Sequence, residues 1–447
     1  MTMQSLDIRP CIGSQIDFGS REGESITLLG MVQNVRALAW GGFLILRTPS
    51  HLIQVVVDKE RVVQGLAEVP VEAAVRVTGE IRAASIKDPA MNPREFELHA
   101  SALELVSRPF EHPLPVDTTK KEMAVSLDRK LDLRPLTLRH ARERAIFRIQ
   151  AAIANEFGRF LSAAGFTRIC TPKIVFSGAE GGANIFTLDY FGRPAFLAQS
   201  PQFYKQMMVG VFGRVFEVGP VFRAEKHNTS RHVNEYTSLD FEMMLDSGFV
   251  DIMQTEANLL NAIFAALAVE CGPELELLGV TPPRLERLVL LEFDEAHEMT
   301  FKHGGLDHRG EDDLAPEEEL FLGEYAAKIW NTEFVFVTHY PTEKRPFYTM
   351  PDPQRPDRTL SFDLLFRGME ITTGGQRLHT YESHLASMQK RGMNPEAFAS
   401  YLQAFRFGMP PHGGLGLGLE RLTARLCGVA NIKEATLFPR DVDRLEP

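Results

Sequence analysis

The chain has 447 residues, of which 44% are hydrophobic and 24% charged, and its formal net charge is -11. This length predicts at least two domains, because a single hydrophobic core stops growing at roughly 250–300 residues. The negative charge argues against a protein that coats nucleic acid without sequence preference, although RNA recognition through a local groove stays open.

Targeting signals are not evident in the sequence. The first ten residues, MTMQSLDIRP, lack a basic stretch followed by an apolar one, so no secretory signal is expected. No run approaches about 18 apolar residues, so no membrane span is expected. The four cysteines are scattered without a CxxC pair, which is typical of a reducing compartment. We therefore expect a cytoplasmic protein.

The N-terminal part of the sequence is rich in predicted strands. Alternating or continuous apolar patterns predict five of them, over residues 26–35, 42–47, 52–58, 73–81 and 96–106. A helical pattern over 59–68 follows the third strand. This arrangement predicts a small Greek-key barrel of the OB type, a common platform for single-stranded nucleic acid or sugars. The polar, proline-containing stretch 107–122 predicts a linker, with the domain boundary near residue 110.

The remainder of the chain mixes helices and strands. Apolar residues at spacings of three and four predict a long amphipathic helix over 139–166. The next stretch, TRICTPKIVF, predicts a strand that Pro172 confines to an edge or an interface. Further strands over 214–224 and 334–340 show no regular βαβ alternation. We therefore expect an α+β domain on a mostly antiparallel sheet.

A first group of polar residues lies between 198 and 244. Ser200 and Pro201 predict a helix start, after which Gln202 and Lys205 lie three apart on one face. That spacing suits the binding of a carboxylate, although a solvated helix face is the simpler alternative.

The next segment, FRAEKHNTSRH, is followed by a second strand-like run. Arg223 and Glu225 are two residues apart and are predicted to share one strand face, as are Ser238, Asp240 and Glu242 on the next strand. A face with these charges cannot pack against apolar helices without a large desolvation cost. The pattern favours a wet cleft over a solvated outer sheet face.

Two later segments contain phosphate- and metal-type chemistry. Glu370 and Thr373 offer hard oxygen ligands suited to magnesium beside phosphates, and Arg377 suits bidentate carboxylate binding. In HGGLGLGLERL, the glycines allow a flat ligand close to the backbone, and Arg421 can reach a phosphate tail. Neither a GxSxG elbow nor an HExxH motif is present, so covalent and zinc-hydrolase mechanisms have little support. His227 and His232 lie five apart in a predicted loop, which disfavours a zinc site.

These segments, in this order, resemble the three signature motifs of class II aminoacyl-tRNA synthetases. GFTRICTPKI resembles motif 1, FEVGPVFRAEKHNTSRHVNEYTSLDFEM motif 2 and HGGLGLGLERL motif 3. RPFYTMPDP and SFDLLFRGMEITTGGQR are similar to the aspartyl subgroup in its compact archaeal-type form. The resemblance runs from about residue 25 to the end of the chain.

The resemblance implies an α+β protein with three parts. They are an OB-fold anticodon-binding domain over 1–110, a linker or hinge over 111–135, and a catalytic domain over 136–447 built on an antiparallel sheet flanked by helices. It implies an aspartate–tRNA ligase that activates L-aspartate with ATP and Mg²⁺ and transfers it to the 3′ end of tRNA-Asp. A homodimer formed through motif 1 is also implied.

The resemblance further implies roles for individual residues. Lys205 and Arg377 would hold the side-chain carboxylate of aspartate, Asp240 its ammonium group, Arg223 the α-phosphate and Arg421 the γ-phosphate. Three residues would be catalytic: Arg223, Glu225 and Arg421. Glu370 would hold magnesium together with Thr373, which stands where a serine is usual. The amino-acid pocket would comprise Glu180, Gln202, Lys205, Arg223, Asp240, Thr373 and Arg377. The ATP site would comprise Arg223, Glu225, Arg231, His232, Val233, Glu370, Gly418, Leu419, Glu420 and Arg421. A protein nucleophile is not needed, because such phosphoryl transfer depends on positioning and charge neutralisation.

In the barrel, the positions that match anticodon-reading residues are Gln33, Arg36, Phe43, Gln54 and Pro93. A proline near position 93 is associated with relaxed tRNA selection in relatives, which favours an enzyme that charges tRNA-Asn as well as tRNA-Asp. The alternatives are a strictly discriminating enzyme, an amide-forming synthetase without tRNA, and a non-catalytic paralogue. The predicted barrel disfavours the second, and Arg223, Glu370 and Arg421 disfavour the third.

Overall fold

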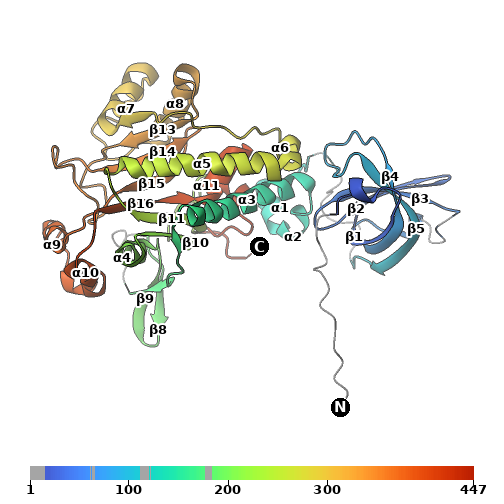
Figure 1. Cartoon of the computed structure of the whole chain (residues 1–447), viewed down its shortest axis with the longest axis horizontal. Coiled ribbons are helices and arrows are strands. Elements are labelled where there is room, and N and C mark those ends of the chain that lie inside the picture. The colour runs from blue at the N-terminus through green and yellow to red at the C-terminus, as the bar shows by residue number, and fades with distance from the viewer. Residues whose placement is uncertain are drawn as a thin grey trace, which may run out of the picture. The chain divides into compact units, whose positions relative to one another are not determined.

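The computed structural model describes residues 16–60, 62, 66–110, 120, 122–176 and 184–446, and the chain divides into two compact units (Figure 1). The first unit comprises residues 1–126 and 135–142, and the second comprises 127–134 and 143–447. The stretch predicted as a linker falls partly outside the described residues, and its described part contains two short helices, α1 (Leu127–Asp132) and α2 (Arg134–Thr137).

A closed five-stranded barrel forms the first unit, as predicted. Its strands pair in the order β1-β2-β3-β5-β4, and β4 closes onto β1. Alternate side chains of each strand face inward, so the barrel has its own apolar core. The helix predicted over 59–68 falls partly outside the described residues, and its described part includes the 3-10 segment η2 (Leu66–Glu68). The strands are β1 (Ser25–Leu38), β2 (Gly41–Arg47), β3 (Leu52–Asp58), β4 (Ala74–Ala83) and β5 (Phe96–Ser107).

An eight-stranded sheet forms the centre of the second unit. Its order is β12-β13-β14-β15-β16-β11-β10-β6, with antiparallel pairing from β13 to β10 and parallel pairs at both edges. The mostly antiparallel sheet predicted from the sequence is confirmed. The strands are β6 (Thr167–Arg168), β10 (Arg214–Phe222), β11 (Glu235–Met244), β12 (Leu290–Glu292), β13 (Phe334–Thr338), β14 (Ser361–Phe366), β15 (Glu370–Gln376) and β16 (His412–Gly418).

The strand predicted for TRICTPKIVF is divided in the structure. Thr167–Arg168 forms the edge strand β6 of the large sheet, whereas β7 (Ile174–Val175) pairs in a separate three-stranded sheet with β9 (Arg193–Leu197) and β8 (Thr187–Tyr190). Pro172 lies between the two segments and has no N–H to donate to a ladder, so one continuous strand does not form.

Helices cover one face of the large sheet and supply most of its core. The long helix predicted over 139–166 is α3 (Ala141–Ala163), and it shares one apolar cluster with α5 (Val250–Glu270) and α11 (Leu419–Cys427) (Figure 1). The other helices are α4 (Gln202–Phe212), α6 (Gly272–Leu278), α7 (Phe293–Met299), α8 (Pro316–Tyr325), α9 (Tyr381–Lys390) and α10 (Ala399–Arg406). The short 3-10 and π segments are η1 (Gly19–Arg21), η3 (Thr300–Gly304), η4 (Ala326–Trp330), η5 (Pro395–Phe398) and η6 (Ile432–Ala435).

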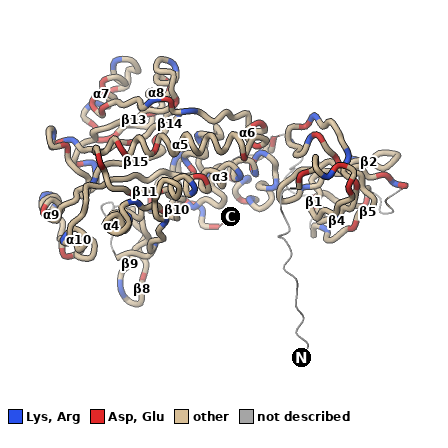
Figure 2. Tube along the Cα trace, viewed as in Figure 1, with Lys and Arg blue, Asp and Glu red and all other residues tan. Residues whose placement is uncertain are grey.

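Among the described residues, α5 alone is long and apolar enough to cross a membrane by length and composition. Its buried side chains belong to the core cluster of the second unit, which is the usual situation of a core helix. Acidic and basic residues are interspersed along both units (Figure 2).

Phe366 generates the first prediction, because its ring stacks on Phe334 at 4.6 Å in the core beneath the sheet and is fully buried. Replacing Phe366 with Ala should lower the free energy of unfolding by about 3–5 kcal/mol, since it leaves a cavity that the sheet cannot close. The measurement is urea denaturation followed by circular dichroism. Phe407→Ala is the matched control, because Phe407 is 83% exposed, and its effect should stay within about 0.5 kcal/mol.

Candidate active site

A cleft of 410 Å³ opens over the centre of the large sheet, and its floor consists of alternate side chains of β11 facing glycines of β16. The register places Ser238 opposite Gly418, Asp240 opposite Gly416, and Glu242 opposite Gly414. A Cβ atom at Gly416 would lie 3.2 Å from Asp240 Oδ1, and one at Gly414 only 2.4 Å from Glu242 Oε2. The glycines therefore leave room for these polar side chains. Of the charged face predicted for this strand, Ser238 and Asp240 line the cleft, whereas Glu242 is fully buried and is not among the lining residues.

Two cations and two carboxylates are buried together in this floor. Lys205, on α4, donates to Asp240 Oδ1 at 2.8 Å and lies 3.5 Å from Glu242 Oε2. Arg377, directly after β15, donates through Nε to Glu242 Oε1 at 2.9 Å. Each cation also donates to a main-chain carbonyl of β16, at 2.8 Å for Lys205 and 2.9 Å for Arg377. The two positive and two negative side chains are thus paired with one another, as buried charges require.

The pKa of Glu242 depends directly on this pairing. Burial raises the pKa of Glu242, but Arg377 and Lys205 lower it more, so it lies below its ordinary value. Two buried atoms of the floor, Asp240 Oδ2 and Gln202 Nε2, have no hydrogen-bond partner among the described residues. Buried polar atoms are normally paired, so a missing partner at both places is a mark of a ligand site.

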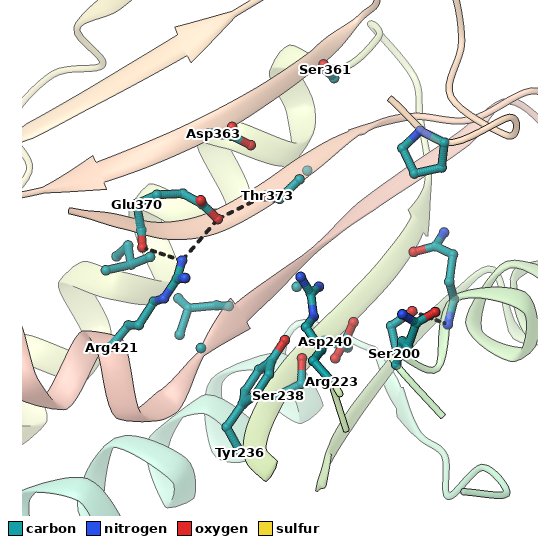
Figure 3. Close-up of a pocket in the computed structure, with 18 of the residues that line it drawn as sticks. Ser200, Arg223, Tyr236, Ser238, Asp240, Ser361, Asp363, Glu370, Thr373 and Arg421 are labelled. Atoms are coloured by element: carbon teal, nitrogen blue, oxygen red, sulfur yellow. Dashed lines mark hydrogen bonds and ion pairs between the residues drawn. The ribbon is translucent and has the colours of Figure 1, made fainter. Parts of the chain in front are cut away.

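Glu370 and Thr373 lie together at the other end of the cleft (Figure 3). On a regular strand, two residues three apart point to opposite faces of the sheet. Here a register shift between Leu364 and Leu365 of β14 inserts one extra residue in β15. The two side chains therefore meet, and Thr373 Oγ1 donates to Glu370 Oε1 at 3.0 Å. Burial raises the pKa of Glu370, but Arg421 and the Thr373 hydrogen bond keep it below its ordinary value.

Asp363 is a functional candidate that sequence reasoning missed. It lies directly opposite Thr373 in the β14–β15 pairing. Its Oδ2 forms an ion pair with Arg345 Nη2 at 2.8 Å. Its buried Oδ1 has no hydrogen-bond partner in the described part of the chain. Burial raises the pKa of Asp363 to about 6, although Arg345 lowers it. The only available sequence signal was an acidic residue inside the apolar run FDLLF.

Arg421 projects into the cleft from the first turn of α11. Its Nη1 donates to the carbonyl of Glu370 at 3.0 Å and lies 3.3 Å from Glu370 Oε1 (Figure 3). Its neighbour Glu420 is buried, and both carboxylate oxygens accept from Thr237 N, at 3.0 and 3.1 Å. Glu420 thus anchors β11 to α11. Leu419, also assigned to the ATP site, is not among the lining residues, and its side chain packs in the apolar core.

The segment after β10 differs from its prediction. Arg223 and Glu225 were expected on a strand, but β10 ends at Phe222, and only the bond from Arg223 N to Asn234 O extends the pairing. Both side chains nevertheless line the cleft, together with Arg231, His232 and Val233. Glu225 Oε2 lies 3.7 Å from His232 Nε2. Burial, Arg421 and Arg231 hold the pKa of His232 below its ordinary value despite Glu225, so the imidazole is neutral at pH 7.

The structure thus brings together most of the predicted catalytic-site residues. Glu180 lies outside the described residues. Helix α4 begins at Gln202, one residue later than predicted, and Ser200 Oγ accepts from Gln202 N at 3.4 Å. The lining also includes residues that the sequence motifs did not single out: Gln199, Tyr236, Asp313, Lys344, Arg345, Tyr348, Thr349, Ser361, Asp363 and Gly416.

The described residues contain no group of three or more His, Cys, Asp or Glu side chains placed to hold a metal on their own. Asp363, Glu370 and Thr373 still fit a magnesium ion that takes its other ligands from phosphates and water, as Mg²⁺ usually does. The buried Oδ1 of Asp363, without a hydrogen-bond partner in the described chain, is the observation that supports this fit.

On the barrel, three of the predicted positions share the outer face. Arg36 lies opposite Phe43 in the β1–β2 pairing, and Trp40 contacts the Phe43 ring edge-on at 5.5 Å. Gln54 Nε2 donates to Glu97 Oε2 at 2.7 Å. Pro93 lies between β4 and β5.

Gln33 differs from these positions. A register shift between Val32 and Asn34 turns two successive side chains inward, and Gln33 is buried with Arg47 as its donor. Its side chain therefore does not reach the outer face of the barrel.

Comparison with known proteins adds independent findings. A family model described as tRNA synthetases class II (D, K and N) matches residues 126–442. The chain is 44% identical over 432 residues to the Aspartate–tRNA(Asp/Asn) ligase of Thermus thermophilus, covering 96% of this chain and 99% of the relative. The Aspartate–tRNA(Asp/Asn) ligase of Archaeoglobus fulgidus is 37% identical over 456 residues, covering 100% of both chains.

Solved structures with the same fold include two synthetases. The asparaginyl-tRNA synthetase from Pyrococcus horikoshii, complexed with asparaginyl-adenylate, matches with a TM-score of 0.85 and 30% identity, covering 96% of this chain and 97% of that one. The aspartyl tRNA synthetase from Entamoeba histolytica matches with a TM-score of 0.81 and 32% identity, covering 100% of this chain and 96% of that one.

The buried charge cluster generates the second prediction. Replacing Glu242 with Gln leaves Lys205 and Arg377 with one carboxylate between them, so the variant should lose about 3–5 kcal/mol of unfolding free energy. The measurement is urea denaturation at pH 7. Glu235→Gln, at an exposed position of the same strand, should change stability by less than about 0.5 kcal/mol. Equal stability of the two variants would contradict the assignment.

Proposed function

The chain belongs to the family of class II tRNA synthetases (D, K and N), and on this premise we propose that it is an aspartate–tRNA ligase. It activates L-aspartate with ATP and transfers the amino acid to tRNA-Asp and also to tRNA-Asn. The observation that carries the proposal is the buried pair of cations, Lys205 and Arg377, in the floor of a cleft whose opposite end holds Glu370, Asp363 and Arg421.

The floor fits aspartate better than asparagine. The aspartate side-chain carboxylate accepts from Lys205 and Arg377, whereas an asparagine amide would offer one oxygen acceptor and turn its N–H donors toward the other cation, which itself only donates. Leaving buried donors unpaired is costly, so the site rejects the amide. Asp240 Oδ2 accepts from the ammonium group of the substrate, and Gln202 Nε2 donates to a carboxylate oxygen of the substrate, since both protein atoms are buried without a hydrogen-bond partner in the described residues.

The opposite end of the cleft suits ATP. A substrate carboxylate oxygen attacks the α-phosphorus, the bond to the bridging oxygen breaks, and pyrophosphate leaves with the electron pair. Arg223 binds the α-phosphate, and Arg421 binds the γ-phosphate, which neutralises the charge that builds up during the displacement. Asp363, Glu370 and Thr373 would hold Mg²⁺, which would supply further charge neutralisation at the phosphates.

The second step joins the aminoacyl group to tRNA. The 3′-hydroxyl of the terminal adenosine attacks the carbonyl of the aspartyl-adenylate, the ester forms, and AMP leaves. The barrel binds the anticodon on the outer face that carries Arg36, Phe43 and Gln54, where the Phe43 ring stacks on an unpaired base.

We also propose a homodimer formed through the segment around Pro172. Ile174 is 50% exposed and Phe176 is 75% exposed in the single chain. Apolar side chains with this exposure favour burial against a second copy, and a symmetric contact between identical chains closes as a dimer.

The amino-acid assignment yields the third prediction. Pyrophosphate exchange into ATP should depend on aspartate and respond roughly a hundredfold less to asparagine, because the amide loses one charged hydrogen bond to a buried donor, at about 1.5–3 kcal/mol, and leaves both cations without the substrate's counter-charge. Lys205→Met should reduce kcat/KM for aspartate by a similar factor, with little change in KM for ATP. Exchange supported equally by asparagine would refute the proposal.

The tRNA assignment yields the fourth prediction. Purified enzyme should attach aspartate to both tRNA-Asp and tRNA-Asn transcripts. Phe43→Ala should raise KM for both transcripts roughly tenfold, in line with the loss of one base–aromatic stack, and should leave pyrophosphate exchange unchanged. The assay is charging with radiolabelled aspartate. If tRNA-Asn receives no aspartate, the enzyme is strictly discriminating.

A further inference from the structure

Glu319, on α8, binds two groups of the active site through one oxygen atom. Its Oε2 accepts from the guanidinium of Arg231 and also from the main-chain N–H of Glu370, the latter at 2.8 Å. Glu319 itself is buried, with 7% of its surface exposed, whereas both of its partners line the cleft. One carboxylate therefore joins the loop after β10 to the first residue of β15.

A contact between two glycines brings α8 close enough for this link. Gly323 of α8 packs on Gly368 of the β14–β15 turn, and a Cβ at Gly323 would lie only 2.3 Å from Gly368 N. Gly368 also has a φ of +73°, a conformation that L side chains rarely adopt, and a Cβ there would lie 2.9 Å from Leu320 Cα. Without side chains at these two positions, the helix approaches the turn closely and presents Glu319 to the backbone of Glu370.

Burial and the nearby Glu370 raise the pKa of Glu319 to about 7, although Arg231 lowers it. The test below is therefore made at pH 8, where the carboxylate is charged and attracts the Arg231 guanidinium.

We propose that Glu319 is a positioning residue for ATP: it orients Arg231 toward the phosphates and fixes the Glu370 main chain beside them. The proposal rests on the proposed function and deepens it. Glu319 acts through Arg231 and does not touch the substrate. Its effect should therefore fall on ATP binding and leave aspartate binding, at the other end of the cleft, unchanged.

The test compares Glu319→Gln with wild type in two assays. The amide keeps an oxygen acceptor for Glu370 N but removes the charge that holds Arg231. Equilibrium binding of Mg²⁺-ATP should weaken roughly tenfold at pH 8, as expected for loss of one charge-assisted hydrogen bond. In pyrophosphate exchange, KM for ATP should rise by the same factor, with KM for aspartate within twofold of wild type.

Two further variants complete the experiment. Glu317→Gln removes an exposed carboxylate of the same helix, 55% exposed and paired with His308, and should bind ATP as wild type does. In an Arg231→Met background, adding Glu319→Gln should change ATP binding by less than twofold, since the partner through which Glu319 acts is already gone.

Three outcomes would overturn the proposal: unchanged or tighter ATP binding by Glu319→Gln, independent additive effects of Glu319→Gln and Arg231→Met, or an equal rise in KM for aspartate. If wild type shows no aspartate-dependent exchange, the proposed function fails. In that event the ATP-binding ratios and the double variant still decide the role of Glu319.

Discussion

Burial of two opposite pairs of charges, Lys205 with Asp240 and Arg377 with Glu242, constrains the rest of the catalytic unit. Ionised groups tolerate a low-dielectric interior only when they are paired and hydrogen-bonded. The relative positions of α4, β11 and the end of β15 are therefore constrained. In the proposed function the same pairing creates selectivity, because a substrate carboxylate offers an oxygen acceptor to each of the two cations, whereas an amide offers one oxygen and turns its N–H donors toward the other cation.

At the end of the cleft that holds Glu370 and Thr373, main-chain geometry determines the direction of the side chains. A one-residue bulge in β15 aligns Glu370 with Thr373, and strand pairing places Asp363 opposite Thr373. Arg421 then reaches Glu370 from the start of α11. Neighbouring arginines favour the charged forms of Asp363 and Glu370. The site therefore suits cationic and phosphate ligands without a protein nucleophile.

The two ends share a dependence on glycine. In β16, glycines keep Cβ atoms away from Asp240 and Glu242, and in α8 a glycine allows the helix to reach the β14–β15 turn. In β16 the missing side chains leave room for the two carboxylates, and in α8 the missing side chain leaves room for the backbone of Gly368. The glycines of HGGLGLGLERL thus lie in a strand, β16, and not in a phosphate-binding loop.

The sequence by itself determined the barrel, the long helix α3, the antiparallel sheet and the motifs whose residues gather in the cleft, because periodicity and motif order are local properties. The tertiary structure decided what depends on contacts between distant segments. It assigned Glu242 to Arg377 and Lys205, revealed Asp363 and Glu319, and turned Gln33 into the barrel. It also ended β10 at Phe222 and split the motif 1 strand at Pro172. Residue spacing cannot report these features, since a carboxylate in an apolar run has the same local pattern whether or not a distant arginine faces it.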